Sequence, residues 1–562
     1  MTELLDQILI FAILALSLNL LLGYAGQVSM AHAAFAGIGG YTVAYLSAEQ
    51  GLSLELSLLI GIALGAVAGF LIGLPALRLR MEYLLLLTIA FQTIFVEVLD
   101  NLDTFGGVYG LPLKDASFFG ANATDAPQFL IPLAILAVIV AALCIRIGES
   151  PFGRVLRGIR EDEVAVRSLG KRVGYDKLLT FTITSAMAAL GGGLLAIYNQ
   201  LAATGEYGFD QSMVIISMVI IGGMASPLGA IAGAVLVEGL QYGLTHWLDV
   251  GSSNAGTIRA IAYGVLVVLF LWLRPAGLFA ERTRRLAPAA GTAEPPAPVP
   301  AAAAGGEEEG EEVLVVTGLS KSFGGIAAVQ GADFRLRRGS ITALVGPNGA
   351  GKTTIFSLLT GFIRPDAGSV QLNGVEVVGR LPEQIAAMGM VRSFQDARVL
   401  TRMTALENVA LGVQGNAGER VSALLLRPGA AAAAERRTRQ EAMRWLEFVG
   451  IGDRADLPVS SFAFGEQKRI ALARVLATEA DVLLLDEPTA GIDPAALDDM
   501  LGLVERVREL GRTVCIVEHN LEVVSRLAEV AYFLDLGKVV ARGPIQELMS
   551  EEKLVEVYFG AH

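Results

Sequence analysis

Residues 346–354 form a glycine-rich loop, Gly346-Pro347-Asn348-Gly349-Ala350-Gly351-Lys352-Thr353-Thr354, that narrows the folds open to the second half of the chain. The loop fits the P-loop pattern G-x-x-x-x-G-K-[ST]. An apolar run at 341–345 predicts a buried strand before it, and residues 355–359 predict a helix after it. Glycines let several backbone N–H groups point at one anion, and the helix N-terminus adds its positive dipole end. We therefore predict a phosphate site in which Lys352 reaches the β- and γ-phosphates of ATP and Thr353 binds Mg²⁺.

The first half of the chain has the composition of a membrane domain. The whole sequence of 562 residues is 53% hydrophobic and 18% charged, whereas soluble proteins have about 25% charged residues. The excess of apolar residues is concentrated before residue 285, in runs close to the roughly 20 residues that cross a bilayer. The predicted spans are Ile8–Tyr24, Met30–Ala48, Leu56–Leu77, Tyr83–Leu99, Phe129–Arg146, Leu178–Tyr198, Ser212–Leu240 and Thr257–Leu273. We expect a polytopic α-helical domain over residues 1–285 with about eight to ten spans, some of them broken or re-entrant.

Two glycine-rich interruptions break these apolar runs. One reads Gly-Gly-Met-Ala-Ser-Pro-Leu-Gly at 222–229, and the other reads Gly-Tyr-Ala-Gly-Gln-Val-Ser at 23–29. Broken backbone at membrane depth must be buried in protein or line a cavity, so it can mark a transport path. A tight crossing of helices through small residues explains the 222–229 break equally well. His32 follows the first break, and we interpret it as a packing histidine rather than a substrate ligand.

Basic residues predict the orientation of the spans. Seven of them fill the loop between the fifth and sixth spans: Arg154, Arg157, Arg160, Arg167, Lys171, Arg172 and Lys177. Loops rich in arginine and lysine face the cytoplasm. The loop at 100–128 is acidic and is expected outside. The soluble half then lies in the cytoplasm, where ATP is available.

The same basic loop contains a predicted short helix over 161–170. Its acidic start and its final Gly170 are typical helix ends. Val164, Ala165 and Leu169 would form a small apolar face. We favour a docking helix on an ATPase over a solvated loop, because an ATPase-like domain follows in the same chain.

A linker over 286–312 separates the membrane domain from a soluble domain over 313–562. It is rich in alanine and proline and ends in an acidic run, so it cannot bury a core. The net charge of −13 argues against a nucleic-acid partner. The two cysteines, Cys144 and Cys515, fall in different domains, so a disulfide is not expected.

Two carboxylates follow a second buried strand of the soluble domain. Four apolar residues at 482–485 lead into Asp486 and Glu487, and ligands of open α/β sheets bind at such carboxyl ends. Asp486 would hold the Mg²⁺ shell, and Glu487 would orient or deprotonate the attacking water. His519 follows the strand at 513–518 and is placed to sense the γ-phosphate. The fold class is therefore a helical membrane domain followed by an α/β P-loop NTPase domain.

The order of these motifs resembles an ABC-transporter ATPase across the whole soluble domain. It runs from the P-loop through Gln395, the stretch Ser461–Gln467, Asp486-Glu487 and Asp493 to His519. The resemblance implies that Gln395 binds Mg²⁺ in the loop that couples the nucleotide to the membrane helices, and that Phe323 stacks on adenine. It further implies that the following residues meet the second ATPase of a dimer: Ala463, Gly465, Glu466 and Asp493.

The stretch 462–466 departs from the family motif Leu-Ser-Gly-Gly-Gln. Ala463 stands where a serine would contact the γ-phosphate, and Glu466 stands where glutamine is expected. The backbone N–H groups and the helix dipole remain. We expect a functional site with a weaker grip on the phosphate.

The membrane half is similar to permeases of branched-chain amino acid importers. The stretches that carry this likeness are 23–29, 106–110, 154–170 and 220–229. The soluble half resembles the ATPases of the same systems, including its long segment between Asn408 and Ser460 and its ending at 558–560. In that family the two components are usually separate chains, and here they are fused.

This resemblance implies an inner-membrane importer driven by ATP and Mg²⁺. It implies a second permease–ATPase set, either a second copy of this chain or a paralogous chain, and an external solute-binding protein. The substrate would be leucine, isoleucine or valine, with urea, short amides and other amino acids left open. An exporter half-transporter and a membrane ATPase complex without solute flux are the alternatives.

Overall fold

The computed structural model describes residues 2–77, 81–114, 117–122, 126–247, 255–274, 276–281 and 311–550. The chain divides into two compact units. The membrane unit comprises Met1–Glu161 and Val173–Arg282, and the soluble unit comprises Asp162–Arg172 and Thr283–His562. Residues 78–80, which follow the third predicted span, the predicted linker up to 310 and the ending at 558–560 lie outside the described residues.

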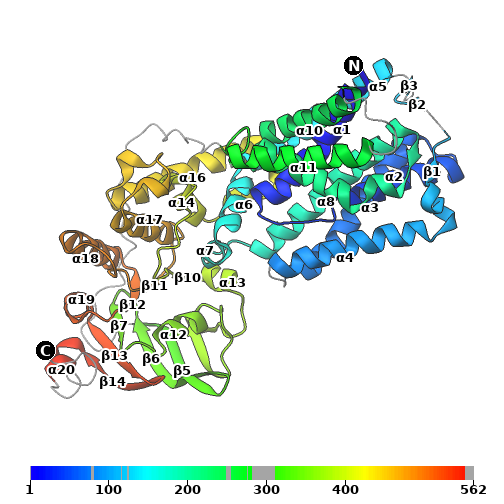
Figure 1. The fold of residues 1–562 in the computed structure, drawn as a ribbon. Coiled ribbons are helices and arrows are strands. Elements are labelled where there is room, and N and C mark those ends of the chain that lie inside the picture. Colours follow the sequence, from blue (N-terminus) through cyan, green and yellow to red (C-terminus); the bar gives the residue numbers. More distant parts are fainter. Residues whose placement is uncertain are drawn as a thin grey trace. The chain divides into compact units, whose positions relative to one another are not determined.

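The membrane unit is a bundle of apolar helices (Figure 1). Its helices are α1 (Thr2–Leu18) with the π-helical turn η1 (Asn19–Tyr24), α2 (His32–Gln50), α3 (Leu54–Ala76), α4 (Met81–Asp100), α5 (Ala126–Gly148), α6 (Pro151–Glu161), α8 (Val173–Asn199), α9 (Phe209–Gly222), α10 (Pro227–Trp247) and α11 (Ala255–Leu273). Short strands β1 (Leu111–Pro112) and β4 (Leu201–Ala202) pair, as do β2 (Ser117–Phe118) and β3 (Ala121–Asn122). Among the described residues, five helices are long and apolar enough to cross a membrane, namely α1 with η1, α3, α4, α5 and α8. The count of eight to ten spans stays a prediction.

The two predicted breaks are present and meet each other. The first run ends in η1 and an irregular stretch, and the run over 212–240 is divided between α9 and α10 at Gly223, which has a φ of 114°. The backbone N–H of Ala225 donates to Asn19 Oδ1 at 2.9 Å. A side chain next to the first break therefore satisfies a backbone hydrogen-bond donor of the second break. A Cβ on Gly222 would lie 2.0 Å from the carbonyl oxygen of Gly229. The second break is therefore also a close helix crossing through small residues, as the alternative interpretation proposed.

Arginine 160 on α6 contacts the backbone of the first break and holds it in place. Its guanidinium donates to the carbonyl oxygen of Gly23 and forms an ion pair of 2.6 Å with Glu281. A Cβ on Gly26, whose φ is 67°, would lie 2.7 Å from the Arg160 side chain. His32 is buried and shares a hydrogen bond of 2.7 Å with Ser17 Oγ, as expected for a packing histidine.

Helices α2 and α8 approach each other through glycine. A Cβ on Gly192 of α8 would lie 2.0 Å from the carbonyl oxygen of Ala36, and one on Gly39 of α2 would lie 1.9 Å from that of Ala189. No rotamer change relieves a clash with backbone, so only a residue without a side chain permits this approach.

We expect Gly192→Val to destabilise the membrane unit by more than about 3 kcal/mol, at the upper end of overpacking effects. The measurement is thermal unfolding of the detergent-purified chain. Gly239→Val is the matched control, because a Cβ at Gly239 of α10 meets no atom of the described residues within 4 Å. Equal melting of the two variants would contradict the close approach.

The soluble unit contains two sheets. The larger sheet has the strand order β10-β11-β12-β7-β13-β14 and is parallel except for β14 (Figure 1). The smaller antiparallel sheet has the order β6-β5-β8-β9. The strands are β5 (Glu312–Phe323), β6 (Ile326–Arg337), β7 (Ile341–Val345), β8 (Ala367–Leu372), β9 (Val375–Glu376), β10 (Met390–Arg392), β11 (Val482–Asp486), β12 (Thr513–Val517), β13 (Val530–Asp535) and β14 (Lys538–Pro544). Glu312, which we assigned to the linker, is the first residue of β5.

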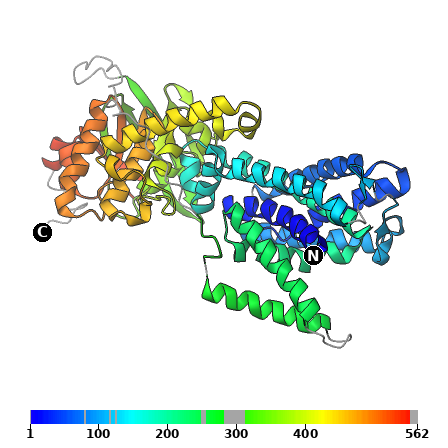
Figure 2. The ribbon, with the colours of Figure 1, turned by 90° about the horizontal axis from the view of Figure 1, so that it is seen from above.

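Helices complete the soluble unit. They are α7 (Glu163–Ser168), α12 (Lys352–Leu359), α13 (Pro382–Ala387), α14 (Ala405–Gly412), α15 (Val421–Leu426), α16 (Pro428–Phe448), α17 (Phe464–Leu476), α18 (Pro494–Glu509), α19 (Leu521–Leu527) and α20 (Ile545–Ser550). The long helix α16 packs along α14 and α17 (Figure 2). Helix α7 comes from the sequence between two helices of the membrane unit, yet it belongs to the soluble unit.

Candidate nucleotide-binding site

The predicted phosphate loop joins the buried strand β7 to helix α12, as the sequence pattern requires. Gly346, Gly349 and Gly351 have φ values of 156°, 85° and 100°, which curl the backbone. A Cβ on Gly351 would lie 2.4 Å from the carbonyl oxygen of Ala328, so no larger residue fits there. Asn348 and Thr353 are exposed, whereas Ala350 is buried and packs beneath the loop.

Lysine 352 is folded back over this loop. Its Nζ donates to the carbonyl oxygens of Gly346 at 2.6 Å and Pro347 at 2.9 Å. Burial lowers the pKa of Lys352 below its ordinary value, and the negative charges of Glu487 and Asp486 oppose that shift. The ammonium group is thus held at the mouth of the loop, where a phosphate would replace the carbonyl partners.

The parallel strands bring Asp486 to the same sheet edge. In the register of the sheet Asp486 is level with Val517 of β12, and Val517 is level with Leu344, two residues before Gly346. Asp486 Oδ2 accepts from Arg392 at 2.6 Å, and its backbone N–H donates to Ser393 Oγ at 3.2 Å. Asp486 Oδ1 is buried and has no hydrogen-bond partner among the described residues. An unpaired carboxylate oxygen beside a phosphate site suits Mg²⁺, which binds through one or two carboxylates and keeps several waters.

Glutamate 487 lies close to the two other predicted catalytic residues, Gln395 and His519. Its Oε2 accepts from Gln395 Nε2 at 2.7 Å, and its Oε1 is 3.9 Å from His519 Nδ1. The backbone carbonyl of Glu487 accepts from Lys468 Nζ at 2.8 Å. The φ of Glu487 is 47°, a strained value for a residue with a side chain. The structure therefore brings Gln395, Glu487 and His519 together around one carboxylate.

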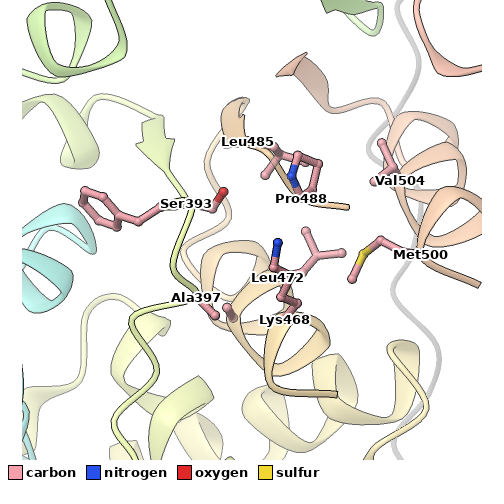
Figure 3. Close-up of a pocket in the computed structure, with 10 residues that line it drawn as sticks. Ser393, Ala397, Lys468, Leu472, Leu485, Pro488, Met500 and Val504 are labelled. Carbon is pink, nitrogen blue, oxygen red and sulfur yellow. The ribbon is translucent and has the colours of Figure 1, made fainter. Parts of the chain in front are cut away.

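A small cavity is lined by Pro488, the residue after Glu487, and by Lys468. It measures about 30 Å³, which is room for little more than one water. Figure 3 shows Ser393 and Ala397 after β10 facing Lys468 and Leu472 of α17 and Met500 of α18. Burial lowers the pKa of Lys468, against the opposing charges of Glu518 and Glu487. The loop that carries Gln395 thus rests on a space that is not tightly filled.

The stretch 462–466, which departs from the family motif, lies at the start of α17. Ala463 N–H donates to Glu466 Oε2 at 3.0 Å, which is the half of a capping box that the glutamate supplies. Glu466 also pairs with Arg454, and this hydrogen bond holds the pKa of Glu466 below its ordinary value. Ala463 is exposed and Gly465 is half-buried. The motif is presented on the surface, where a partner can reach it.

Asp493 and Phe323 also lie on the surface. Asp493 immediately precedes α18 and is exposed. Phe323 ends β5 with 46% of its surface exposed, and Lys321 Nζ lies 5.6 Å from its ring centroid. An exposed ring beside a cation suits stacking on a base.

Residues 162–172 dock onto the same unit. Lys171 Nζ pairs with Glu419 at 2.7 Å and donates to the carbonyl oxygen of Val413 at 2.9 Å. Gln414 Nε2 donates to the carbonyl oxygen of Leu169 at 2.7 Å. The buried face differs in one residue from the predicted one. Val166 is buried beside Ala165 and Leu169, whereas Val164 is half-buried. The helix is capped by Asp162 and begins at Glu163, two residues later than predicted.

Sequence reasoning missed Arg392 and Lys468, which contact the two acidic residues. Arg392 is a charged residue directly after the apolar pair Met390-Val391 and close to Gln395, which could have identified it, whereas Lys468 lies in a polar stretch with no such signal.

Known proteins match both halves. The family described as "Branched-chain amino acid transport system / permease component" matches residues 1–273, and the family described as "ABC transporter" matches residues 329–490. The high-affinity branched-chain amino acid transport ATP-binding protein BraF of Pseudomonas aeruginosa is 34% identical over 249 residues, which are 44% of this chain and 98% of BraF. LivG of Escherichia coli, with the same description, is 32% identical over 251 residues, again 44% of this chain and 98% of the relative.

A solved structure of a nucleotide-free ATP-binding cassette from an ABC transporter is 29% identical, with 45% of this chain and 100% of that chain covered and a TM-score of 0.40. The curated relatives are matched over almost their whole length by the soluble half, and the permease family is matched by the membrane half. The chain therefore belongs to the ABC transporters of the branched-chain amino acid transport family, with permease and ATPase components fused in one polypeptide.

Proposed function

We propose that this chain imports branched-chain amino acids, or related small amino acids and amides, across the inner membrane with the ATPase domain in the cytoplasm. The observation that carries this proposal is the joining of the permease component at 1–273 to an assembled P-loop site in a single chain. The names of the relatives support branched-chain amino acids as the substrate class.

In this proposal each predicted residue of the nucleotide site has a role in binding or hydrolysing ATP. The loop N–H groups of residues 346–354 and Lys352 bind the phosphates of ATP. Thr353, Asp486 and Gln395 would hold Mg²⁺, which neutralises charge on the β- and γ-phosphates when bound. Glu487 accepts the proton of the attacking water, with Gln395 and His519 orienting the carboxylate and sensing the γ-phosphate.

The surface position of the α17 motif supports pairing with a second ATPase. Ala463, Gly465, Glu466 and Asp493 would face the ATP bound by a second permease–ATPase set, either a second copy of this chain or a paralogous chain. An external solute-binding protein would deliver the substrate. Segment 162–172 would carry the closing motion of the two ATPases toward the membrane helices.

The test is uptake of labelled leucine into liposomes that contain the chain, with ATP on the ATPase side and a leucine-loaded binding protein on the other. Wild type should accumulate leucine and hydrolyse ATP faster with the loaded protein, and Glu487→Gln should do neither. ATP-dependent movement in the opposite direction would favour the exporter. Hydrolysis indifferent to every loaded binding protein would favour a complex without solute flux.

We expect Ala463→Ser to raise the ATP turnover number of the chain by about threefold to tenfold, because a hydroxyl would add one hydrogen bond to the γ-phosphate of the partner's ATP. The measurement is phosphate release by the reconstituted chain. Ala463→Gly is the matched control, since glycine also caps helices but adds no donor. An unchanged turnover number in the serine variant would show that this site relies on backbone N–H groups alone.

A further inference from the structure

Residues 420–437, which we call the basic tip, form an exposed apolar and basic surface where α15 meets α16. They contain four arginines and a single acidic residue, in a chain whose net charge is −13. Val421 and Leu424 are buried and fix α15 on the soluble unit. Leu425 is nevertheless 47% exposed and Leu426 81% exposed. Exposed leucines beside basic residues are typical of surfaces that bind a partner or lie on a membrane.

The positive charge of the basic tip is not neutralised within the soluble unit. Its one acidic residue, Glu435, is already engaged, because its carboxylate accepts from Arg439 and from Asn416, both at 3.0 Å. The guanidinium groups of the four arginines make no hydrogen bond or ion pair with a described residue, and all four residues are exposed: Arg420, Arg427, Arg436 and Arg437. The basic tip therefore suits an anionic surface.

Chain connectivity keeps the basic tip close to lipid headgroups. Glu419 pairs with Lys171 at 2.7 Å, and α15 begins two residues after Glu419. Lys171 in turn lies two residues before α8, which begins at Val173 and whose predicted apolar span begins at Leu178. The intervening helix rises by about 8 Å, and a headgroup layer is roughly 5–8 Å thick. The chain thus enters the headgroups close to Lys171, next to the residue that precedes the basic tip.

We propose that the basic tip binds anionic phospholipids of the membrane that α8 enters, with its arginines on the lipid phosphates and Leu425 and Leu426 among the headgroups. Guanidinium groups bind phosphate oxygens through two N–H groups at once, and the leucines add apolar contact with the lipid. The surface lies outside the nucleotide site and adds a lipid attachment to the soluble unit. It rests on the proposed function for the cytoplasmic side, where the membrane surface is anionic.

The test is quenching of a fluorophore on Leu426→Cys by lipids that carry a spin label on the headgroup, with the full chain in nanodiscs. The native Cys144 and Cys515 are buried and should not take up the fluorophore. In discs rich in phosphatidylglycerol the spin-labelled lipid should reduce the emission at least about twofold. In discs of phosphatidylcholine alone the quenching should be less than about half as large, because the surface carries no net charge.

A fluorophore on Leu536→Cys is the matched control for position. Leu536 is 74% exposed and lies in the turn between β13 and β14, at the other end of the soluble unit from α16 (Figure 1). Its emission should not respond to the spin-labelled lipid in either kind of disc. Equal quenching at positions 426 and 536 would overturn the proposal, because it would show lipid contact that is not specific to the basic tip.

Arg420→Gln together with Arg427→Gln tests the charge. In the chain labelled at position 426, this pair should reduce the quenching in phosphatidylglycerol discs at least about threefold. Arg364→Gln together with Arg542→Gln removes the same charge from exposed positions outside the basic tip and should change nothing.

The outcomes separate this proposal from the proposed function. Quenching at position 426 that is absent or indifferent to lipid charge would overturn the lipid surface, and in a chain that still imports leucine it would leave the proposed function intact. A chain that shows the expected quenching but takes up no leucine would keep the lipid surface and lose the proposed function.

Discussion

The variant Glu487→Gln is expected to hydrolyse ATP at least about 100-fold more slowly than wild type while binding ATP as tightly, because a general base contributes about 10²–10⁴-fold. Glutamine has the shape of glutamate and can still accept from Gln395 through its amide oxygen, so the site keeps its geometry. It cannot take a proton from water. The loss should therefore appear in the turnover number and not in nucleotide affinity.

The measurement combines phosphate release and binding of a fluorescent ATP analogue to the full chain. Glu479→Gln is the matched control, since Glu479 is an exposed carboxylate of the same unit outside the nucleotide site. Turnover of Glu487→Gln within a few-fold of wild type would mean that another group activates the water. A loss of binding would mean that the carboxylate is a structural residue.

The variant Lys352→Met is expected to lose both binding and turnover. Charge-assisted hydrogen bonds contribute about 1.5–3 kcal/mol each, so losing the ammonium group should weaken ATP binding by at least about tenfold. Methionine occupies a similar volume, but the carbonyl oxygens of Gly346 and Pro347 lose their donor. Turnover at saturating ATP should also fall, because the ammonium charge stabilises the transferred phosphoryl group.

A titration of the fluorescent analogue measures the affinity, and phosphate release at saturating ATP measures the turnover. Lys538→Met is the control for removing a positive charge, because Lys538 is exposed on β14. Wild-type affinity in Lys352→Met would exclude contact between this lysine and the phosphates.

The nucleotide site could be predicted from sequence largely because its parts are local. A strand, a glycine turn and a helix start are contiguous at 341–359, and the two acidic residues end a contiguous apolar strand. Arg392 and Arg398 could not be assigned in the same way. Their partners Asp486 and Asp162 lie 94 and 236 positions away in the sequence, and only the fold brings them together.

In the membrane unit too, contacts between residues far apart in the sequence could not be predicted. Glycines marked both interruptions of the apolar runs, but nothing in the pattern showed that they meet through Asn19 and Ala225, 206 positions apart. For the docking helix the sequence predicted a start at 161, two residues before the observed start at Glu163, and assigned Val164 to the buried face where the structure has Val166. A helix turns about 100° per residue, so such a shift changes which side chains face the partner.

Because of segment 162–172, the chain passes between the two units more often than a simple fusion requires. The polypeptide leaves the membrane unit after Glu161, returns at Val173 and leaves again after Arg282. A protease cut between 283 and 310 would therefore leave the rest of the soluble unit joined to segment 162–172 only by non-covalent contacts, those of Lys171, Leu169 and Asp162 with Glu419, Gln414 and Arg398. Fusion in one polypeptide fixes one ATPase domain per permease domain and raises their effective concentration, whereas the contacts of segment 162–172 do not depend on the linker.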